Sequence, residues 1–238
     1  MSLISRTRAF IGHALCFHRI HNGSGAELNI RKLQIKSQWH HFQEWRRTLS
    51  DKSPFSNRQP WMTFDAIYYL RSNLSSHFVV FEWGSGGSTL FFRECCKSVI
   101  TVEHDIDFAH IMEPLLNQEF ASDLHQYIVA PPTDNDEEVE GCKSLMIPGS
   151  FANYVRSIDN YDDQSFDVIS VDGRSRNSCI NAAIGKLRNG GLLIIDNSER
   201  LQYSKGLECV PQSWKRLSFP GCGPYNRYFW ETTVFVKQ

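Results

Sequence analysis

Short apolar runs separated by helical segments limit the fold of this chain more than any other feature. From Pro60 onward, runs that indicate buried strands lie at residues 78–81, 99–102, 126–130, 166–171 and 192–195. Helices are expected at residues 61–70, 90–97, 108–116, 151–158 and 179–187, the last ended by Asn189-Gly190-Gly191. Two further strands, 214–217 and 232–236, are expected to form a terminal antiparallel pair. Alternation of this kind predicts an α/β protein with a wound, mostly parallel sheet.

The first of these strands breaks into a glycine-rich turn that opens a helix. Residues 79–89 have the sequence Val-Val-Phe-Glu-Trp-Gly-Ser-Gly-Gly-Ser-Thr. Glycine lets backbone N–H groups approach a ligand closely, and the N-terminus of the following helix is electropositive. Glu82, two residues before Gly84, would repel a pyrophosphate but attract an ammonium group. The turn therefore predicts a zwitterionic or cationic ligand, although structural turns of this composition are common.

A carboxylate follows the second predicted strand at an informative distance. Glu103 lies 19 residues after Gly84, which is about the spacing at which a nucleotide-binding βαβ unit places an acid on ribose hydroxyls. Ser88 or Thr89 is available to cap the helix between them. The alternative is that Glu103 is only a solvated residue at a strand end. The predicted ligand-binding residues are Glu82, Gly84, Ser85, Gly86, Ser88, Glu103 and His104.

The N-terminal segment differs from the rest in charge. Residues 1–50 hold eight Lys or Arg against two Glu, although the whole chain has a net charge of −1. Apolar residues recur at helical spacing between residues 35 and 49, which predicts an amphipathic helix, and Asn-Gly-Ser-Gly at 22–25 predicts a break before it. We therefore divide the chain into a basic helical extension, 1–59, and a domain, 60–238.

A basic amphipathic helical arm of this kind can have either of two roles. It can lie on an anionic membrane or nucleic acid surface, or it can pack on its own domain, which we favour. We expect no nucleic-acid partner and leave peripheral membrane contact open. Five of the nine histidines fall in the arm without a repeated ligand spacing, so we expect no metal cluster among them.

Cysteine usage and hydropathy indicate a cytoplasmic protein. Seven cysteines, with no C-x-x-C pair, fit neither a disulfide framework nor a zinc site. No apolar run approaches the roughly 20 residues that a membrane span requires. The apolar run at residues 10–17 is short and contains His13, so we expect no secretory signal peptide.

Four motifs in this order resemble the class I S-adenosylmethionine-dependent methyltransferases. They are the turn at 82–89, Val-Glu-His-Asp at 102–105, Phe-Asp-Val-Ile-Ser-Val-Asp-Gly at 166–173 and Gly-Gly-Leu-Leu-Ile-Ile-Asp-Asn at 190–197. The resemblance covers residues 60–237. It implies a Rossmann-like seven-stranded methyltransferase sheet whose last strand is antiparallel. It also implies S-adenosylmethionine as cofactor, with Glu82 facing its ammonium group and Glu103 its ribose.

Within this class the chain resembles most the catechol O-methyltransferase-like branch. That branch holds a divalent cation with an Asp after the fourth strand and an Asp-Asn pair after the fifth, which here are Asp172, Asp196 and Asn197. Neighbouring strands lie about 4.8 Å apart, so these oxygen ligands would lie side by side and suit Mg²⁺. Asp172 is the predicted catalytic residue, which organises the acceptor. The alternative is that Asp172 only orients substrate or cofactor and that Asp196-Asn197 forms a turn.

The chain departs from this branch at the position of the general base. The branch has a lysine soon after the fourth-strand Asp, where this chain has Arg174 and Arg176. Arginine does not deprotonate usefully but grips carboxylates and phosphates well, so the two either bind an anionic acceptor or pair with the acidic loop at 134–140. His104 is a conceivable base, although its place beside Glu103 suggests cofactor packing.

The activity that the resemblance implies is methylation of an oxygen on a small molecule or glycan. Three alternatives stay open. An aminopropyltransferase would use the decarboxylated cofactor and an acidic polyamine pocket, to which the 134–140 loop would contribute. A nicotinamide dehydrogenase would normally have an apolar residue in place of Glu82. A non-catalytic descendant would keep the fold and bind a partner through the basic arm.

Overall fold

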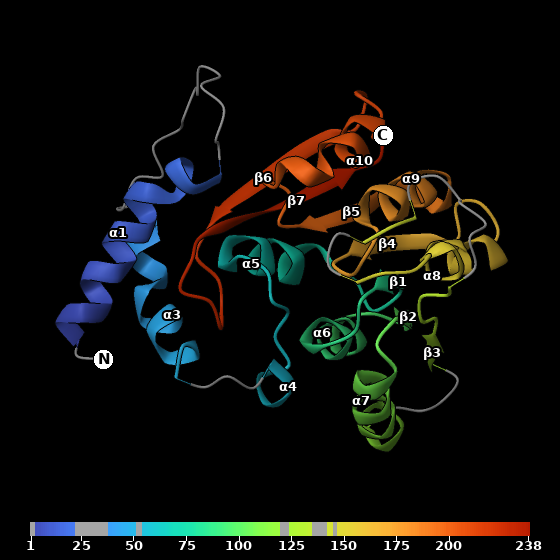
Figure 1. The fold of residues 1–238 in the computed structure, drawn as a ribbon, viewed down its shortest axis with the longest axis horizontal. Helices are drawn as coiled ribbons and strands as arrows, with labels where there is room; N and C mark the ends of the chain where they lie inside the picture. Colours follow the sequence, from blue (N-terminus) through green and yellow to red (C-terminus); the bar gives the residue numbers. More distant parts are fainter. Residues whose placement is uncertain (1–2, 22–37, 51–53, 120–123, 135–141, 145–146) are drawn as a thin grey trace.

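The computed structural model of the chain describes residues 3–21, 38–50, 54–119, 124–134, 142–144 and 147–238. The predicted break at 22–25, the start of the amphipathic helix at 35–37 and residues 135–141 of the acidic loop lie outside the described residues. Among the described residues, no helix combines the length and the apolar character needed to cross a membrane. Figure 1 shows the helices of the domain packed around a twisted sheet, with the N-terminal helices at one side.

A single sheet of seven strands forms the centre of the domain. The strands are β1 (Val79–Trp83), β2 (Ser98–Glu103), β3 (His125–Val129), β4 (Phe166–Val171), β5 (Leu187–Asp196), β6 (Lys215–Gly221) and β7 (Trp230–Val236). Their spatial order is β3-β2-β1-β4-β5-β7-β6. Strands β1 to β5 pair in parallel, and β7 runs antiparallel to both β5 and β6. The predicted fold class is confirmed.

Both faces of the sheet are buried, which explains the continuous apolar runs in the sequence. Along β1 and β4, Val80 and Val168 belong to one core cluster, whereas their neighbours Phe81 and Ile169 belong to the other. This alternation follows from the two-residue period of a strand. Helices on each face complete the two cores.

The first core is covered by α5 (Phe64–Asn73) and α6 (Gly87–Cys95), and α7 (Ile106–Glu119) packs beside α6. The second core is covered by α8 (Ala152–Arg156), the 3-10 turn η3 (Ser157–Asn160), α9 (Arg176–Lys186) and α10 (Ser204–Cys209), which follows the turn η4 (Leu201–Tyr203). The sequence analysis did not predict α10. α10 belongs to the segment that follows β5, and it packs on α9.

Two of the predicted boundaries that differ from the structure have a clear local cause. The helix expected from residue 61 begins at Phe64, after the extended residue Thr63. Asn189-Gly190-Gly191, expected to end a helix, instead lies inside β5, because α9 already ends at Lys186. Gly190 has φ +78° and donates its N–H to Lys237 O at 2.9 Å. Glycine there permits the irregular pairing of β5 with β4.

The described part of the N-terminal extension packs on the domain. It contains α1 (Leu3–His21), the turn η1 (Trp39–His41), α3 (Phe42–Thr48) and α4 (Pro54–Asn57). In Figure 1, α1 and α3 lie side by side next to the connection between β6 and β7. Phe10 of α1 and Trp45 of α3 are fully buried, and the Phe10 ring lies 5.1 Å from those of Trp45 and Phe229. Trp45 Nε1 also donates to Asn226 O at 2.9 Å.

This packing removes Phe42 and Trp45 of α3 from solvent, whereas Trp39 of the predicted apolar face is 46% exposed. Contact of the extension with a membrane surface stays a prediction. So do the division at residue 59 and the cytoplasmic location.

Replacing Trp45 with alanine should lower the free energy of unfolding by about 3–5 kcal/mol, because a fully buried aromatic ring is lost and a cavity remains. Trp45→Phe retains most of the ring packing but loses the hydrogen bond to Asn226, and should cost about 1 kcal/mol for that bond. Urea denaturation measures both effects. Trp39→Ala is the matched control, because Trp39 is 46% exposed. Equal effects of Trp39→Ala and Trp45→Ala would contradict the docked arrangement.

Candidate active site

A cavity of about 430 Å³ opens at the carboxyl ends of β1, β2 and β4. The strand order reverses between β1 and β4, and open α/β sheets bind ligands at such a point. The residues that line the cavity are Gly84, Ser85, Glu103, His104, Asp105, Phe108, Lys143, Ser144, Asp172, Gly173, Arg174, Ser175, Arg176, Asn177, Arg200, Gln202 and Tyr203. Five of the predicted site residues are among them: Gly84, Ser85, Glu103, His104 and Asp172.

Two glycines let the loops after β1 and β4 approach each other. Gly84 has φ +94°, and a Cβ there would lie 3.0 Å from Gly173 N. A Cβ at Gly173 would collide with the hydroxyl of Tyr154. Both positions therefore require glycine for structural reasons. Gly86 differs, because a Cβ there would meet nothing within 4 Å, so its lack of a side chain leaves open space in the turn.

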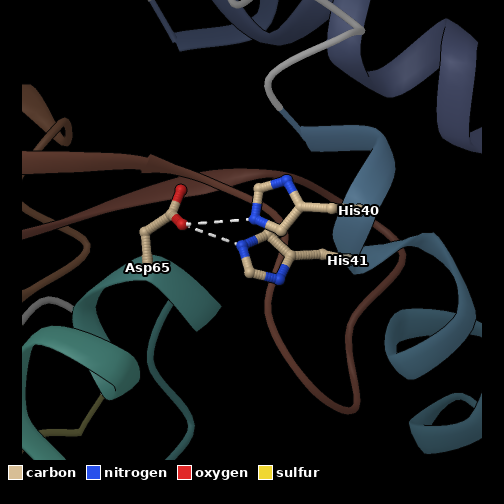
Figure 2. A group of neighbouring side chains, drawn as sticks. All are labelled: His40, His41 and Asp65. Atoms are coloured by element: carbon tan, nitrogen blue, oxygen red, sulfur yellow. Dashed lines mark hydrogen bonds and ion pairs between the residues drawn. The ribbon is translucent and has the colours of Figure 1, made fainter.

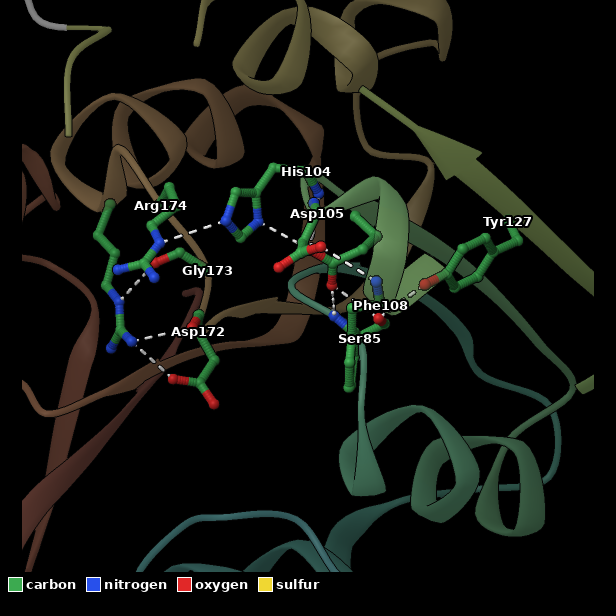
Figure 3. Close-up of polar contacts among 10 residues, drawn as sticks. Ser85, His104, Asp105, Phe108, Tyr127, Asp172, Gly173 and Arg174 are labelled. Atoms are coloured by element: carbon green, nitrogen blue, oxygen red, sulfur yellow. Dashed lines mark hydrogen bonds and ion pairs between the residues drawn. The ribbon is translucent and has the colours of Figure 1, made fainter. Parts of the chain in front are cut away.

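Glu103 is held by the residues around it at the end of β2. Its Oε2 accepts hydrogen bonds from Ser85 N at 3.0 Å and Ser85 Oγ at 2.7 Å, and its Oε1 accepts from the N–H groups of His104 and Asp105 (Figure 3). Burial by itself would raise the pKa of Glu103. The hydrogen bonds from His104, Asp105 and Ser85 outweigh burial and lower the pKa to about 2. Glu103 is therefore a fixed anion on the cavity wall.

His104 connects this anion to the loop after β4. Its Nδ1 lies 2.7 Å from Glu103 Oε1, and its Nε2 accepts a hydrogen bond from Arg174 Nε at 3.4 Å (Figure 3). Because Nε2 accepts this hydrogen bond, it carries the lone pair of the ring. The side chain of His104 therefore links Glu103 to Arg174 on the cavity wall.

Glu82 does not line the cavity. It is 1% exposed and lies below the first turn of α6, where its carboxylate accepts hydrogen bonds from Ser88 Oγ at 2.9 Å and Thr101 Oγ1 at 2.8 Å. Burial raises its pKa to about 7, although hydrogen bonds from Thr89, Thr101 and Ser88 oppose the shift. The predicted contact of Glu82 with an ammonium group has no support in this arrangement, because Ser88 and Thr101 already occupy its oxygens.

The hydrogen bond to Glu82 also explains the orientation of the Ser88 side chain. Its hydroxyl turns toward Glu82 and away from the cavity. The helix cap comes instead from Thr89, whose hydroxyl accepts a hydrogen bond from Gly86 N at 3.1 Å. Ser88 therefore supports the turn from beneath.

Arg176 holds the ends of β4 and β5 together. Its guanidinium donates to Asp172 Oδ1 at 2.8 Å, to Asp172 O at 2.9 Å and to Gly173 O at 3.0 Å. It also donates to the backbone carbonyl of Asp196. Of the two arginines that we expected to bind an acceptor or the acidic loop, Arg176 is thus committed to the chain itself.

The three predicted metal ligands do not fit a divalent cation. The guanidinium of Arg176 lies between the strand ends that carry Asp172 and Asp196, so a positive charge already stands there. Asp196 is 3% exposed, and its Oδ1 accepts hydrogen bonds from Trp230 Nε1 and Thr232 Oγ1. Burial and the charge of Asp172 raise the pKa of Asp196 to about 8. Oδ1 of Asp196 is already engaged by two donors of the chain itself.

Asn197 adopts the turn conformation that was the alternative to metal binding. It has φ +53°, and its carbonyl accepts a hydrogen bond from Arg200 N at 3.1 Å. Asparagine tolerates this left-handed backbone better than most residues. Among the described residues, neither Asp196 nor Asn197 lines the cavity.

The sequence analysis missed several residues of the site. Tyr127 of β3 lies with its hydroxyl 2.8 Å from Ser85 Oγ, which extends the network of Glu103 (Figure 3). Arg200 and Tyr203 reach the cavity from the segment after β5. Arg176 was named in the sequence analysis, but not as the partner of Asp172, although it stands four residues after Asp172, the spacing of neighbours on a helix. The others come from distant segments and leave no local pattern.

The sheet order and the cavity at its switch point define the chain as a protein with the Rossmann-like fold of the class I S-adenosylmethionine-dependent methyltransferases. A search of known protein families gives no match, and no curated protein matches the sequence. Among solved structures, the chain is similar to a candidate rRNA methylase from Clostridium thermocellum. The TM-score is 0.51 at 12% identity, over 73% of this chain and 94% of that one. This likeness establishes the fold alone.

Two other similar structures have TM-scores below 0.5. A methyltransferase-like protein from Silicibacter pomeroyi matches at 0.49 with 23% identity, over 76% of this chain and 89% of that one. Spermidine synthase from Thermotoga maritima matches at 0.45 with 16% identity, over 71% of this chain. The match spans only 56% of the length of that synthase.

The raised pKa of Glu82 predicts a pH-dependent stability. Its folded-state pKa of about 7 exceeds its ordinary value of 4.5, so between these values the folded chain holds a proton that the unfolded chain releases. The contribution of Glu82 to the free energy of unfolding should therefore fall as pH rises through this window. Glu82→Gln is permanently neutral and should remove this contribution. Asp172 and Asp196, whose pKa values are also raised, act in the same direction as Glu82, and His125, whose pKa burial lowers to about 4, acts in the opposite direction. Glu103, whose pKa is lowered, acts below the window with the opposite sign.

Urea denaturation at several pH values across the window measures this slope. Glu94→Gln is the control, because Glu94 lies on the exposed side of α6, the helix above Glu82, with 38% of its side chain accessible. An identical slope in wild type and Glu82→Gln would contradict the assignment.

Removal of the Arg176 guanidinium should be costly. Arg176→Met leaves Asp172 without its partner and three backbone carbonyls without a donor, so the free energy of unfolding should drop by at least roughly 3 kcal/mol. This is the lower end of the range for a broken buried ion pair, because Asp172 retains 27% exposure of its side chain. Arg174→Met, two residues away, is the control and should change stability far less. Chemical denaturation measures the free energy of unfolding of both variants. Equal values for Arg176→Met and Arg174→Met would refute the role of Arg176 in bridging the ends of β4 and β5.

Proposed function

We propose that the protein is an S-adenosylmethionine-dependent methyltransferase that acts on an oxygen nucleophile of a small molecule or glycan. The observation that carries the proposal is the cavity at the strand-order reversal, walled by Gly84 and Ser85 after β1, Glu103 and His104 after β2 and Asp172 after β4. These are the segments whose motifs resemble the class I methyltransferases. The fold supports the proposal but does not specify the acceptor.

The residues around the cavity fit the cofactor. The open space at Gly86 leaves the turn accessible to a ligand. Glu103, a fixed anion at the end of β2, stands where a ribose would be bound, and one of its four described hydrogen-bond donors is a side-chain hydroxyl, Ser85 Oγ. A ribose hydroxyl can replace that donor without disturbing the backbone. Glu82 acts from beneath, by fixing Ser88 and β2 through Thr101.

When bound, the cofactor supplies an electrophilic methyl group on a sulfonium sulfur. The work of the protein is then to align an oxygen nucleophile with that group and to exclude water. Asp172 lines the cavity and is oriented by Arg176, so it can position an acceptor hydroxyl through its remaining oxygen. His104 Nε2 can receive the hydroxyl proton once the acceptor displaces the Arg174 N–H that now donates to it.

Positive side chains on the cavity wall favour an anionic acceptor. Four basic side chains line the cavity, those of Lys143, Arg174, Arg176 and Arg200, against three acidic ones, those of Glu103, Asp105 and Asp172. Arginine binds carboxylates and phosphates in a bidentate manner. The acceptor that fits best therefore carries a hydroxyl and a carboxylate or phosphate group. We assign no metal to this reaction, because Arg176 stands between the proposed ligands.

Gly86→Val should abolish binding of S-adenosylmethionine while the fold is retained, because the added side chain enters the open space of the turn. Gly12→Val is the matched control, since a Cβ at Gly12 also meets nothing within 4 Å but lies in α1. Glu103→Ala should weaken binding by about 1–3 kcal/mol, the scale for losing a hydrogen bond to a charged group. Isothermal titration calorimetry measures all three variants.

The same titrations with decarboxylated S-adenosylmethionine and with NAD separate the remaining alternatives. Tighter binding of the decarboxylated form would favour an aminopropyltransferase, and binding of NAD alone would favour a dehydrogenase. Wild-type affinity for S-adenosylmethionine in both Gly86→Val and Glu103→Ala would refute the methyltransferase proposal.

A further inference from the structure

Two histidines of the N-terminal extension meet one acid of the domain, away from the cavity. His41 Nε2 lies 2.8 Å from Asp65 Oδ1, and His40 Nε2 lies 3.9 Å from the same oxygen. Figure 2 shows both imidazole rings directed at the Asp65 carboxylate from the turn before α3. The three ligand atoms lie within 4.8 Å of one another. The sequence concealed this group, because Asp65 stands 24 residues after His41.

The carboxylate of Asp65 is held in place from behind. Its second oxygen, Oδ2, accepts a hydrogen bond from Gln38 Nε2 at 2.8 Å. Gln38 is 3% exposed, and its Oε1 in turn accepts from Cys222 N at 3.1 Å. Partners of this kind orient the ligands of metal sites and fix which atom faces the ion. Oδ1 is therefore presented to the two histidines.

The imidazole side chains of His40 and His41 differ in how much the surrounding packing restricts them. His41 is 2% exposed, and its ring lies 5.2 Å from that of Phe64 and 5.6 Å from that of Tyr68, nearly parallel to the latter. His40 has 62% of its side chain exposed. One ligand is thus fixed by packing, and the other can adjust at an open side where water can enter.

We propose that His40, His41 and Asp65 bind one divalent transition-metal ion of the zinc type. Two imidazole nitrogens and one carboxylate oxygen, with water in a fourth position, are a typical ligand set for Zn²⁺. Mg²⁺ and Ca²⁺ prefer oxygen ligands only. Bonds of about 2.0–2.1 Å in a tetrahedral site place ligand atoms about 3.3 Å apart. The present separations of 2.8 and 3.9 Å lie on either side of that value.

The ion would connect the extension to the domain. His40 and His41 belong to η1, and Asp65 lies in the first turn of α5. An ion that binds only this folded arrangement stabilises it by mass action. None of the three residues lines the cavity, so the proposed site does not depend on the methyltransferase proposal.

The experiment titrates the full chain, free of any histidine tag, with Zn²⁺ and follows binding by calorimetry and the melting temperature. We expect one high-affinity ion per chain and a rise in melting temperature that a chelator reverses. His40→Ala should weaken Zn²⁺ binding at least tenfold and lose the rise. His40 is exposed, so this variant should fold normally. Mg²⁺ should leave the melting temperature unchanged.

His77→Ala is the matched control, because His77 is an exposed histidine outside the group, and it should bind Zn²⁺ as wild type does. Two outcomes would overturn the proposal. One is no Zn²⁺-dependent rise in the wild type, which would leave His41 and Asp65 as a hydrogen-bonded pair only. The other is equal Zn²⁺ affinity in His40→Ala and wild type, which would place the ion elsewhere.

Discussion

The guanidinium of Arg176 holds the carboxyl ends of two neighbouring strands in one place. Parallel strands direct their last carbonyl groups toward the same edge of the sheet, and there Arg176 donates to the carbonyls of Asp172, Gly173 and Asp196. Because the same group pairs with the Asp172 side chain, it also sets the direction of a carboxylate on the cavity wall. The position of the β4 and β5 ends, and the direction of the Asp172 carboxylate on the cavity wall, thus depend on one side chain.

The acids around the site differ because their surroundings differ. Glu103 accepts four hydrogen bonds, three of them from backbone N–H groups, and its pKa is lowered although only 3% of the residue is exposed. Glu82 and Asp196 are buried to a similar degree with fewer donors, and burial raises their pKa values. Glu103 lines the cavity, whereas Glu82 and Asp196 do not. The number of hydrogen-bond donors therefore distinguishes Glu103 from the two acids behind the wall.

Local sequence patterns predicted the strands and their order well, because a sheet buried on both faces requires continuous apolar runs. They also placed Gly84, Glu103, His104 and Asp172 correctly at strand ends, which all face one crevice in a parallel sheet. Whether Glu82, Ser88 and Asp196 face the cavity depends on the direction in which each side chain points. That direction depends on partners such as Thr101, Thr232 and Trp230 from other strands.

The sequence by itself determined the fold class and the position of the crevice. The fold class follows from continuous apolar strands that alternate with helical segments, and the crevice follows from the carboxyl ends of parallel strands. Only the tertiary structure decided which acids line the cavity and which lie behind it. It also decided that an arginine stands where a cation was expected, and that His40 and His41 meet Asp65. The physical reason is that hydrogen bonds and ion pairs between distant segments depend on how the chain packs, and no local pattern records them.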